Sequence, residues 1–392
     1  MELELKYGCN PNQQHARLLI QDDPSPLEVL NGSPGYINLL DALRGWQLVT
    51  DLESFVGKPA AASFKHVSPA GCAVAGDLSI AMRKSQFLPD DVELSPVASA
   101  YVKARSSDRV ASFGDFIAVS DTVGTSLAHI IKPEVSDGII APDYEDEALD
   151  ILKQKKKGNY VILRMDRDYQ PPAIEHRYEF GITLEQSHND AVVDRALLSP
   201  DRIVTDAKEI DDVAIETALV ATIALKHTQS NSVSVGYEGQ AIGIGAGQQS
   251  RIACTRIACD KAERWFLKLH PKAVQLEFHE GMPRSEKVNA VDQFIRYNEL
   301  DDSERAQFAE RIAGSFEPLT DEERSDWLSS FSGIVLSSDA FFPFRDNLDR
   351  AAKSGASIVV QPGGSARDAD VTAAANEHGM VMFHTGVRLF LH

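Results

Sequence analysis

The sequence lacks the features that would place the protein in a membrane or outside the cell. No apolar run approaches the roughly 20 residues needed to span a bilayer, and the opening MELELKYG lacks the basic-then-apolar pattern of a signal peptide. The few cysteines, Cys9, Cys72, Cys254 and Cys259, are scattered without the spacing of a disulfide framework or a zinc ribbon. We therefore predict a cytoplasmic protein with reduced thiols and no structural metal.

An excess of basic residues is also absent. The 39 lysines and arginines are outnumbered by 58 aspartates and glutamates, and the resulting net charge of −19 would repel a nucleic-acid backbone. No basic stripe interleaved with aromatic residues offsets this charge. Nucleic acid is therefore not expected as a partner, whereas a small anion can still bind in a cleft where local Lys, Arg and backbone N–H groups set the potential.

What is present is the pattern of a large α/β protein. Hydrophobic residues make up 43% and charged residues 25% of the 392, as is usual for folded soluble chains, and this length predicts about two or three structural units. Short apolar runs alternate with helical patterns nearly throughout. Strands are expected at 60–66, 111–120, 137–142, 159–165, 233–247, 333–338, 356–363 and 379–390, with a hairpin turn at Glu238–Gly239.

Helical patterns and a weak repeat suggest how these strands are organised. An amphipathic helix should begin near Asp211, behind an acidic first turn, and another should cover 248–270. The charged segment at about 271–327 has few β-branched residues and reads as a helical insertion. Residues 136–161 and 338–358 both read as strand, helix, strand. Chance and duplication explain this match about equally well, and duplication would mean two similar halves.

Two stretches in the second half are candidates for ligand binding. The loop GIGAGQQSR, 243–251, offers glycines and a helix start to an anion, but it fits neither the dinucleotide motif nor the P-loop, and a plain strand-to-helix turn explains it as well. Asn231, just before it, could donate to an oxyanion or could simply end a helix. In SSDAFFPFRDN, 337–347, three phenylalanines beside a carboxylate suit a planar heterocycle, although a core-filling aromatic cluster is the commoner outcome.

The stretch SFKHVSPAG, 63–71, places a lysine and a histidine side by side at the end of an apolar run. Lys65 and His66 combine a permanent cation with a base that titrates near neutrality, provided that both side chains enter one cleft. Neighbouring residues of a strand point to opposite faces, so the chain must turn here, and residues 67–71 are the expected turn. From this stretch alone, a solvated lysine and a structural histidine would be the commoner outcome.

Together these strings resemble one family. FKHVSPAG, SFGDF, VSDGIIAP, TQSNSV, GQAIGIGAGQQSRI, SSDAFFPFRDN and TGVRLF occur in the order and approximate spacing of the AICAR transformylase domain of the bifunctional purine-biosynthesis enzyme AICAR transformylase/IMP cyclohydrolase. The resemblance runs from KYGCNPNQQ at residue 6 to the last residue, and we expect no cyclohydrolase half in this chain. It implies transfer of the formyl group of 10-formyltetrahydrofolate to the 5-amino group of AICAR, giving FAICAR and tetrahydrofolate.

The same resemblance implies an architecture. The family's fold is a pair of cytidine-deaminase-like three-layer α/β/α units, here expected at 1–195 and 196–392 with the helical insertion in the second. The family acts as a homodimer with active sites at the subunit interface. The deaminase zinc signature H-x-E with P-C-x-x-C is missing, so no metal is carried over from that fold.

The resemblance also assigns residues. The catalytic set is Lys65, His66 and Asn231. The AICAR contacts are Lys6, Tyr7, Gly114, Asp137, Asn231, Arg251, Phe341 and Arg388, and the folate contacts are Ile252, Asp346, Ser365 and Ala366. Three departures from the family stand out: Lys6 where many members have Arg, the Gly363–Gly364–Ser365 loop, and Leu391 in a tail that is commonly His-His. The last bears on a monovalent cation, such as potassium, that the family binds near its tail.

Two other classes of function are alternatives. One is a regulatory protein that binds AICAR and folate but has lost catalysis, against which the intact Lys65, His66 and Asn231 argue. The other is a deaminase-type hydrolase, against which the missing zinc ligands argue. The formyl donor, folate or formyl phosphate, is not determined by the sequence.

Overall fold

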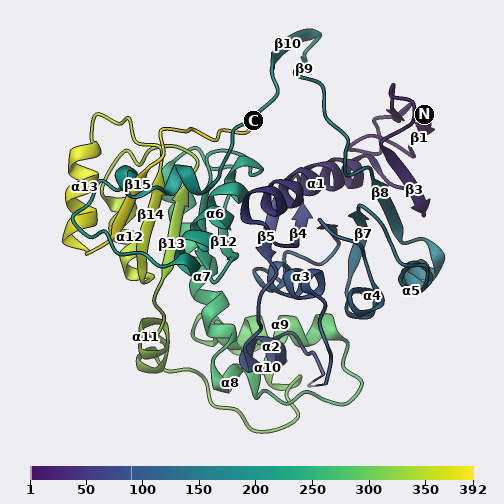
Figure 1. The fold of residues 1–392 in the computed structure, drawn as a ribbon. Helices are drawn as coiled ribbons and strands as arrows, with labels where there is room; N and C mark the ends of the chain where they lie inside the picture. The colour runs from purple at the N-terminus through teal and green to yellow at the C-terminus, as the bar shows by residue number, and fades with distance from the viewer. Residues whose placement is uncertain (1, 90) are drawn as a thin grey trace.

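The computed structural model describes residues 2–89 and 91–392, and one mixed sheet of eleven strands forms its centre (Figure 1). The strands lie in the order β15-β14-β13-β11-β12-β5-β4-β6-β7-β8-β3. Helices alternate with strands along the chain and cover the sheet, which confirms the predicted α/β class. The sheet is continuous through both halves of the chain, because β12 pairs with β5.

The two halves of the sheet have the same topology. Each contains an antiparallel hairpin, then a strand antiparallel to the first hairpin strand, then two parallel strands. The first half uses β4 (Ala60–Lys65), β5 (Ser68–Val74), β6 (Asp115–Val119), β7 (Ser136–Ala141) and β8 (Val161–Met165), with β3 (Leu27–Asn31) added at the end. The second uses β11 (Val233–Tyr237), β12 (Gln240–Gly245), β13 (Ile334–Ser338), β14 (Ala356–Gln361) and β15 (Val381–His384). This repeat favours duplication over chance, but it makes β7 and β8 equivalent to β14 and β15, so the predicted match of 136–161 with 338–358 was wrong by one strand.

Helices cover both faces of the sheet because its strands are apolar on both sides. One face carries α1 (Tyr36–Val56) and α6 (Asp212–Lys226), whose buried residues share a core with both halves of the sheet. The other face carries α3 (Pro96–Ser106), α4 (Thr125–Ile131) and α5 (Asp146–Lys153) in the first half. In the second half it carries α7 (Arg251–Lys268), α12 (Asp346–Lys353) and α13 (Asp368–Glu377), with α2 (Ile80–Ser85) against the same core.

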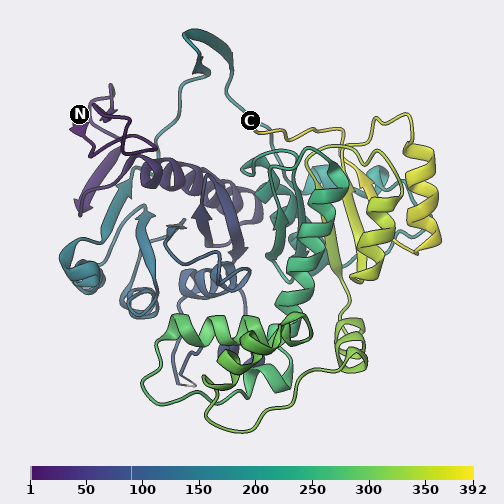
Figure 2. The ribbon, with the colours of Figure 1, turned by 180° about the vertical axis from the view of Figure 1, so that it is seen from behind.

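The segment predicted as an insertion is helical and has a small core of its own. It contains α8 (Pro271–Val274), α9 (Arg284–Ile295), α10 (Asp302–Ala309) and α11 (Asp321–Ser329), with Phe294 and Phe308 fully buried between them. Figure 2 shows these helices, in green, together at one end of the molecule, away from both termini. The predicted unit boundary at 195/196 stays a prediction, as does the likeness to cytidine deaminases.

Two small ribbons stand outside the main sheet. The first pairs β1 (Glu2–Glu4) with β2 (Arg17–Leu19) near the N-terminus. The second is a hairpin of β9 (Ile174–Glu179) and β10 (Ile182–Ser187), which projects from the body of the protein (Figure 1). The sequence analysis predicted neither ribbon.

Candidate active site

The predicted site residues of the sheet lie along one of its edges, which we call the Lys65 edge. Strands β4, β12, β13, β14 and β15 end at this edge, and β5, β6, β7, β8 and β11 begin there. The loops that carry Gly114, Asp137, Asn231, Phe341 and Ser365 therefore all lie along this edge, although they come from both halves of the chain.

Lys65 and His66 sit at the tip of the β4–β5 hairpin. Lys65 pairs with Ser68, so the turn consists of only His66 and Val67, and both have left-handed φ angles of 55° and 62°. The predicted turn at 67–71 was therefore wrong, because the residues from Ser68 onward form a strand. His66 is exposed at the tip, while the Lys65 ammonium donates to the carbonyl of Phe113 at 2.7 Å.

Gly114 and Asp137 lie next to this lysine contact. Gly114 follows Phe113 with a φ of 78°, and a Cβ added to it would lie 3.9 Å from Oδ1 of Asp137. The Asp137 carboxylate accepts from Nζ of Lys156 at 2.5 Å, and Lys156 itself has a left-handed φ of 50°. The structure thus places Lys65, Gly114 and Asp137 close together, and the ion pair with Lys156 was not foreseen.

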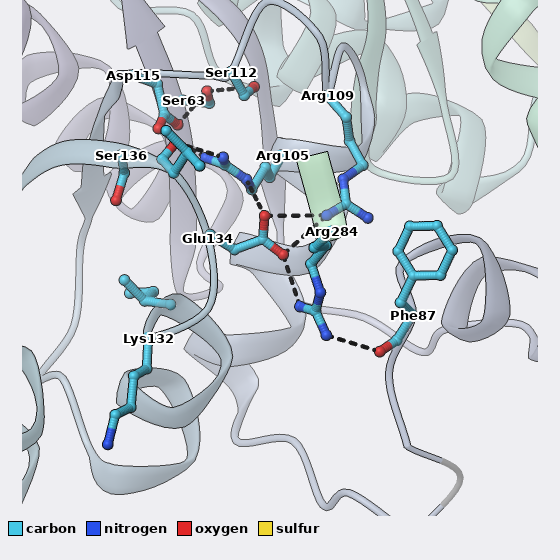
Figure 3. Close-up of polar contacts among 12 residues, drawn as sticks. Ser63, Phe87, Arg105, Arg109, Ser112, Asp115, Lys132, Glu134, Ser136 and Arg284 are labelled. Carbon is cyan, nitrogen blue, oxygen red and sulfur yellow. Dashed lines mark hydrogen bonds and ion pairs between the residues drawn. The ribbon is translucent and has the colours of Figure 1, made fainter. Parts of the chain in front are cut away.

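A buried polar network lies beneath this loop (Figure 3). Asp115, the residue after Gly114, is fully buried and accepts from Ser63 Oγ at 2.6 Å and Arg105 Nη1 at 2.7 Å. Arg105 also donates to the carbonyl of Val135 at 2.9 Å, the same oxygen that accepts from the N–H of Gly114 at 3.1 Å. The network therefore holds Gly114 and Asp115, the two residues that follow the Phe113 carbonyl to which Lys65 donates.

Glu134 joins this network to the helical insertion. Its carboxylate contacts Arg105 at 3.3 Å and Arg109 at 2.9 Å, both from the α3 region, and Arg284 of α9 at 2.8 Å (Figure 3). Burial alone would raise the pKa of Glu134, but the positive charges of Arg109, Arg105 and Arg284 outweigh it and lower the pKa to about 2. The ion pair of Arg284 with Glu134 therefore links the insertion to the first half of the sheet, through a carboxylate that is ionised at neutral pH.

A second cluster lies where β11 begins and β13 ends. Asn231 accepts from Arg251 Nη2 at 2.7 Å, and its amide nitrogen donates to the carbonyls of Gln248 and Gln249 at 2.9 and 3.2 Å. Arg251 is buried and also forms an ion pair with Asp339, which is fully buried. The structure thus joins Asn231 to Arg251, and both amide hydrogens of Asn231 are already bonded within the chain.

The aromatic loop divides between surface and core. Phe341 and Phe344 are 42% and 56% exposed, whereas Phe342 is fully buried beneath them. Arg388 is exposed on the C-terminal tail, which follows Asp339 because the N–H of Leu389 donates to the Asp339 carbonyl at 2.8 Å. The core interpretation therefore holds for Phe342 alone, and flat apolar faces are available beside the Arg388 tail.

The predicted folate contacts lie further along the same edge. Ile252 and Asp346 line one cavity of about 280 Å³ between α7 and α12, together with Arg256, Asp349, Arg350 and Lys353. Ser365 and Ala366 precede Arg367, whose guanidinium lies 5.6 Å from the centre of the Phe344 ring. The structure therefore brings Ile252 to Asp346, and the Ser365 loop to the aromatic loop.

Lys6 and Tyr7 occupy the N-terminal ribbon. Lys6 is exposed and its Nζ lies 5.8 Å from the centre of the Tyr7 ring. The preceding Leu5 is buried in the core that α1 shares with the sheet, together with Leu39 of α1. Within the described residues, no hydrogen bond or ion pair joins Lys6 or Tyr7 to the other predicted site residues.

The glycine loop that resembled a phosphate cradle serves packing. A Cβ on Gly243 would lie 2.1 Å from the Ala258 carbonyl oxygen, and one on Gly245 would lie 2.2 Å from the Cys254 carbonyl oxygen. Both contacts are impossible for a side chain, so these glycines let α7 approach β12 closely. Gly243 and Gly245 lie within β12 and not in the strand-to-helix turn, so neither predicted explanation fits these two glycines.

A larger cavity lies at the other edge of the sheet. It measures about 660 Å³ and is lined by residues at the carboxyl ends of β6, β7 and β8, among them Asp121, Asp143 and Arg167. None of the predicted site residues lines it. In the part of the chain that the structure describes, no three His, Cys, Asp or Glu side chains gather to hold a metal ion, and no helix is long and apolar enough to cross a membrane.

Sequence reasoning missed several residues that hold the site. Asp41, Arg105, Asp115 and Lys156 all contact a predicted residue or its immediate neighbour. Their positions in the sequence give no spacing signal, since each contact joins elements far apart in the chain. An aspartate on the apolar face of a helix, such as Asp41 in α1, is the one signal that could have been found.

Known proteins are similar to this chain over almost its whole length. A family model for the AICARFT/IMPCHase bienzyme matches residues 1–261. The bifunctional purine biosynthesis protein PurH of Mesorhizobium japonicum is 31% identical over 393 residues, and that of Elusimicrobium minutum is 31% identical over 398 residues. Each alignment covers 99% of this chain and 58% of the relative, so the chain spans little more than half the length of these curated relatives. The chain belongs to the AICARFT/IMPCHase bienzyme family.

Proposed function

We propose that the protein is a formyltransferase of purine biosynthesis that moves the formyl group of 10-formyltetrahydrofolate to the 5-amino group of AICAR. The observation that carries this proposal is the Lys65 edge, where the loops of the family's catalytic and binding motifs meet. Lys65, Gly114 and Asp137 form one cluster there, and Asn231 and Arg251 form another, with the exposed Phe341 on the loop that follows β13.

The chemistry gives each catalytic residue a task. The 5-amino group of AICAR is a poor nucleophile, since its lone pair is drawn into a ring that bears a carboxamide, and it must lose a proton as it attacks. His66 is exposed at the hairpin tip and can accept that proton. The attack produces an oxyanion, which the Lys65 ammonium can stabilise once it leaves the Phe113 carbonyl. Collapse of this intermediate breaks the bond between the formyl carbon and the folate nitrogen, which leaves as tetrahydrofolate with the proton that His66 accepted. Asn231 is the neutral donor in this scheme, provided that a substrate oxygen replaces one of its backbone acceptors.

The binding residues follow the chemistry of the two substrates. The 5′-phosphate of AICAR needs cations, for which Lys6, Arg251 and Arg388 are the candidates. Asp137 can accept from the ribose hydroxyls, and the exposed Phe341 can cover the imidazole. Asp346 lines a cavity with Ile252 and can accept from the amino and ring N–H groups of a pterin, with Ser365 and Ala366 beyond it.

One chain does not bring both clusters onto one molecule of AICAR. Asp137 follows the start of β7 and Phe341 follows the end of β13, and six strand spacings of about 4.8 Å separate these strands, or roughly 29 Å. That span is more than twice the length of a nucleotide monophosphate. A homodimer in which the first cluster of one chain faces the second cluster of its partner would complete the site, as the family resemblance implies.

The β9–β10 hairpin supports such a dimer. Its apolar side chains are open to solvent, with Tyr178 at 78%, Phe180 at 100% and Ile182 at 63% exposure. A two-stranded ribbon with apolar residues on the outside is barely stable alone in water. We infer that a second copy of the chain packs against this hairpin and buries its apolar side chains. Replacing Phe180 by Asp should shift the protein toward monomers in light scattering and lower activity with it.

The monovalent cation and the formyl donor remain predictions. Leu391 uses its backbone at the tail, where its N–H donates to Ser230 Oγ at 3.1 Å and its carbonyl accepts from the Ser230 N–H at 2.9 Å. Potassium dependence of the rate, measured against sodium and choline, tests the cation. Rates with 10-formyltetrahydrofolate and with formyl phosphate identify the donor.

The deciding experiment mixes the protein with AICAR and 10-formyltetrahydrofolate and follows tetrahydrofolate. We expect turnover by the native protein and a loss of roughly 10²–10⁴ in kcat for His66→Ala, with AICAR affinity nearly unchanged. His129→Ala, which removes an exposed histidine of α4, should keep full activity. Binding of both substrates without turnover would favour the regulatory alternative, and near-normal turnover by His66→Ala would refute the assigned base.

A further inference from the structure

The turn that carries His66 has a conformation that its own residues disfavour. Two-residue hairpin turns with positive φ at both positions are normally built from Asn-Gly or Gly-Gly. Here the pair is His66 and Val67, with φ angles of 55° and 62°, and a β-branched residue at positive φ is a true outlier. Something outside the hairpin must stabilise the turn, because such strain persists only where the surroundings impose it.

Asp41 of α1 is placed to impose it. Oδ1 of Asp41 accepts from the backbone N–H of Val67 at 2.6 Å, and the backbone of His66 also bonds to this carboxylate. Asp41 is only 5% exposed, and it has no ion pair among the described residues. A buried carboxylate without a cationic partner lowers the stability of a fold, so its only visible compensation is the turn that it holds.

Burial and the neighbouring groups shift the pKa of Asp41 in opposite directions. Burial raises the pKa of Asp41, while the hydrogen bond from Val67 and the nearby His66 act in the opposite direction. Burial is the larger effect, so the pKa of Asp41 is raised overall, and the two residues that it orients only partly offset this rise. Nothing else in α1 requires an acidic residue here, since the other buried positions of this helix are apolar or glycine.

We propose that Asp41 is a positioning residue that holds the His66–Val67 turn in its left-handed form and thereby keeps Lys65 and His66 aimed at one point of the Lys65 edge. Without the two backbone bonds, Val67 relaxes toward negative φ and the hairpin tip changes direction. His66 then moves relative to Lys65, which remains tied to Phe113. Displacements of about 1 Å can lower a rate by roughly 10²-fold.

The test uses glycine to relieve the turn of its strain. Asp41→Ala should lower kcat by about 10²-fold and leave AICAR affinity within about twofold. Val67→Gly, added to Asp41→Ala, should restore kcat to within about tenfold of the native value, because glycine adopts positive φ without help. Val67→Gly alone should stay near native activity. Failure of the added glycine to restore activity would overturn the proposal, since a general packing role for Asp41 would not be rescued there.

Two further measurements cover the remaining outcomes. Asp41→Asn keeps a side-chain acceptor of the same size and should fold and retain kcat within about tenfold, whether or not Asp41→Ala folds; a larger loss would overturn the role of the hydrogen bonds. Amide exchange at Val67 should be slow in the native protein and at least about tenfold faster in Asp41→Ala, with Asp41→Asn closer to the native protein. An unprotected Val67 amide in the native protein would also overturn the proposal.

This inference rests on the proposed function only where it speaks of kcat. If native protein shows a protected Val67 amide but no formyl transfer, the proposed function fails and the turn stands. If formyl transfer is normal but Asp41→Ala retains native kcat, the positioning role fails and the function stands. Asp211→Asn is the matched control, since Asp211 also accepts a backbone N–H, from Ala214 at 2.7 Å, but at the start of α6, the end of that helix that lies away from the Lys65 edge.

Discussion

The buried carboxylate of Glu134 should contribute strongly to folding, and the contribution should depend on pH. Its side chain is 6% exposed and contacts three guanidinium groups, those of Arg105, Arg109 and Arg284. The pKa falls from 4.5 to about 2 in the folded protein. A difference of about 2.5 pH units corresponds to about 3 kcal/mol of stabilisation at neutral pH, at about 1.36 kcal/mol for each unit.

Glu134→Gln should therefore lower the free energy of unfolding at pH 7 by about 3 kcal/mol, because buried arginines lose their counter-charge. The folded pKa lies below the unfolded one, so the stabilisation is complete above pH 4.5 and disappears as the pH falls toward 2. At pH 3 about 2 kcal/mol of it should already be lost. The difference between native protein and variant should thus shrink steadily below pH 4.5.

Urea unfolding followed by tryptophan fluorescence measures this difference, since Trp265 is buried in the core of the second half. Arg284→Ala is the companion variant. It removes one of three cations and should destabilise by only about 1–2 kcal/mol, as Arg105 and Arg109 remain in place. A Glu134→Gln variant within about 1 kcal/mol of native stability at pH 7, or one whose deficit does not change between pH 6 and pH 3, would refute this reasoning.

Further predictions concern the folate cavity, the glycine loop and the Lys156 ion pair. Asp346→Ala should weaken 10-formyltetrahydrofolate binding by roughly tenfold or more in calorimetry, through loss of charged hydrogen bonds, and leave AICAR binding unchanged; equal loss for both ligands would contradict the assignment. Gly245→Ala should destabilise by about 1–3 kcal/mol because its Cβ meets the Cys254 carbonyl oxygen at 2.2 Å, whereas Gly76→Ala, which meets only the flexible Nζ of Lys103 at 3.1 Å, should change little. Lys156→Ala should change stability by at most about 1 kcal/mol, since the pair with Asp137 is exposed, and a larger fall in thermal unfolding experiments would show that it has another role.

The strands of this fold were predictable where apolar runs are unbroken, and β5 shows why one was not. Pro69 and Gly71 normally mark a turn, yet both lie inside β5. Pro69 lies opposite Phe64 beside an irregularity of the ladder, and a Cβ on Gly71 would lie 2.3 Å from Ser107. Gly71 is therefore required by close packing against the segment after α3, which the local sequence does not reveal.

The true turn at His66–Val67 was hidden for a related reason. Neither residue favours positive φ, so local propensity assigns these positions to the strand. The turn is decided by Asp41, 26 residues before Val67 in the chain, through a contact that exists only after α1 has packed on the sheet. Motifs could identify Lys65 and His66, while the groups that orient them belong to tertiary structure.

Equivalent strands of the two halves present opposite ends at the Lys65 edge. The pairing of β5 with β12 is antiparallel, so the first half presents the starts of β6 and β7 at the Lys65 edge, while the second half presents the ends of β13 and β14 there. Duplication alone would give two equal sites on opposite edges. The carboxyl ends of β6 and β7 do enclose the cavity of about 660 Å³, but Asp121 and Asp143 there face Arg167 and Arg164 instead of the Arg251 and phenylalanine faces of the second half. In the proposed function, the first half contributes its hairpin tip, with Lys65 and His66, and the second half contributes the carboxyl ends of its strands. A site that needs both then requires the first half of one chain to meet the second half of another.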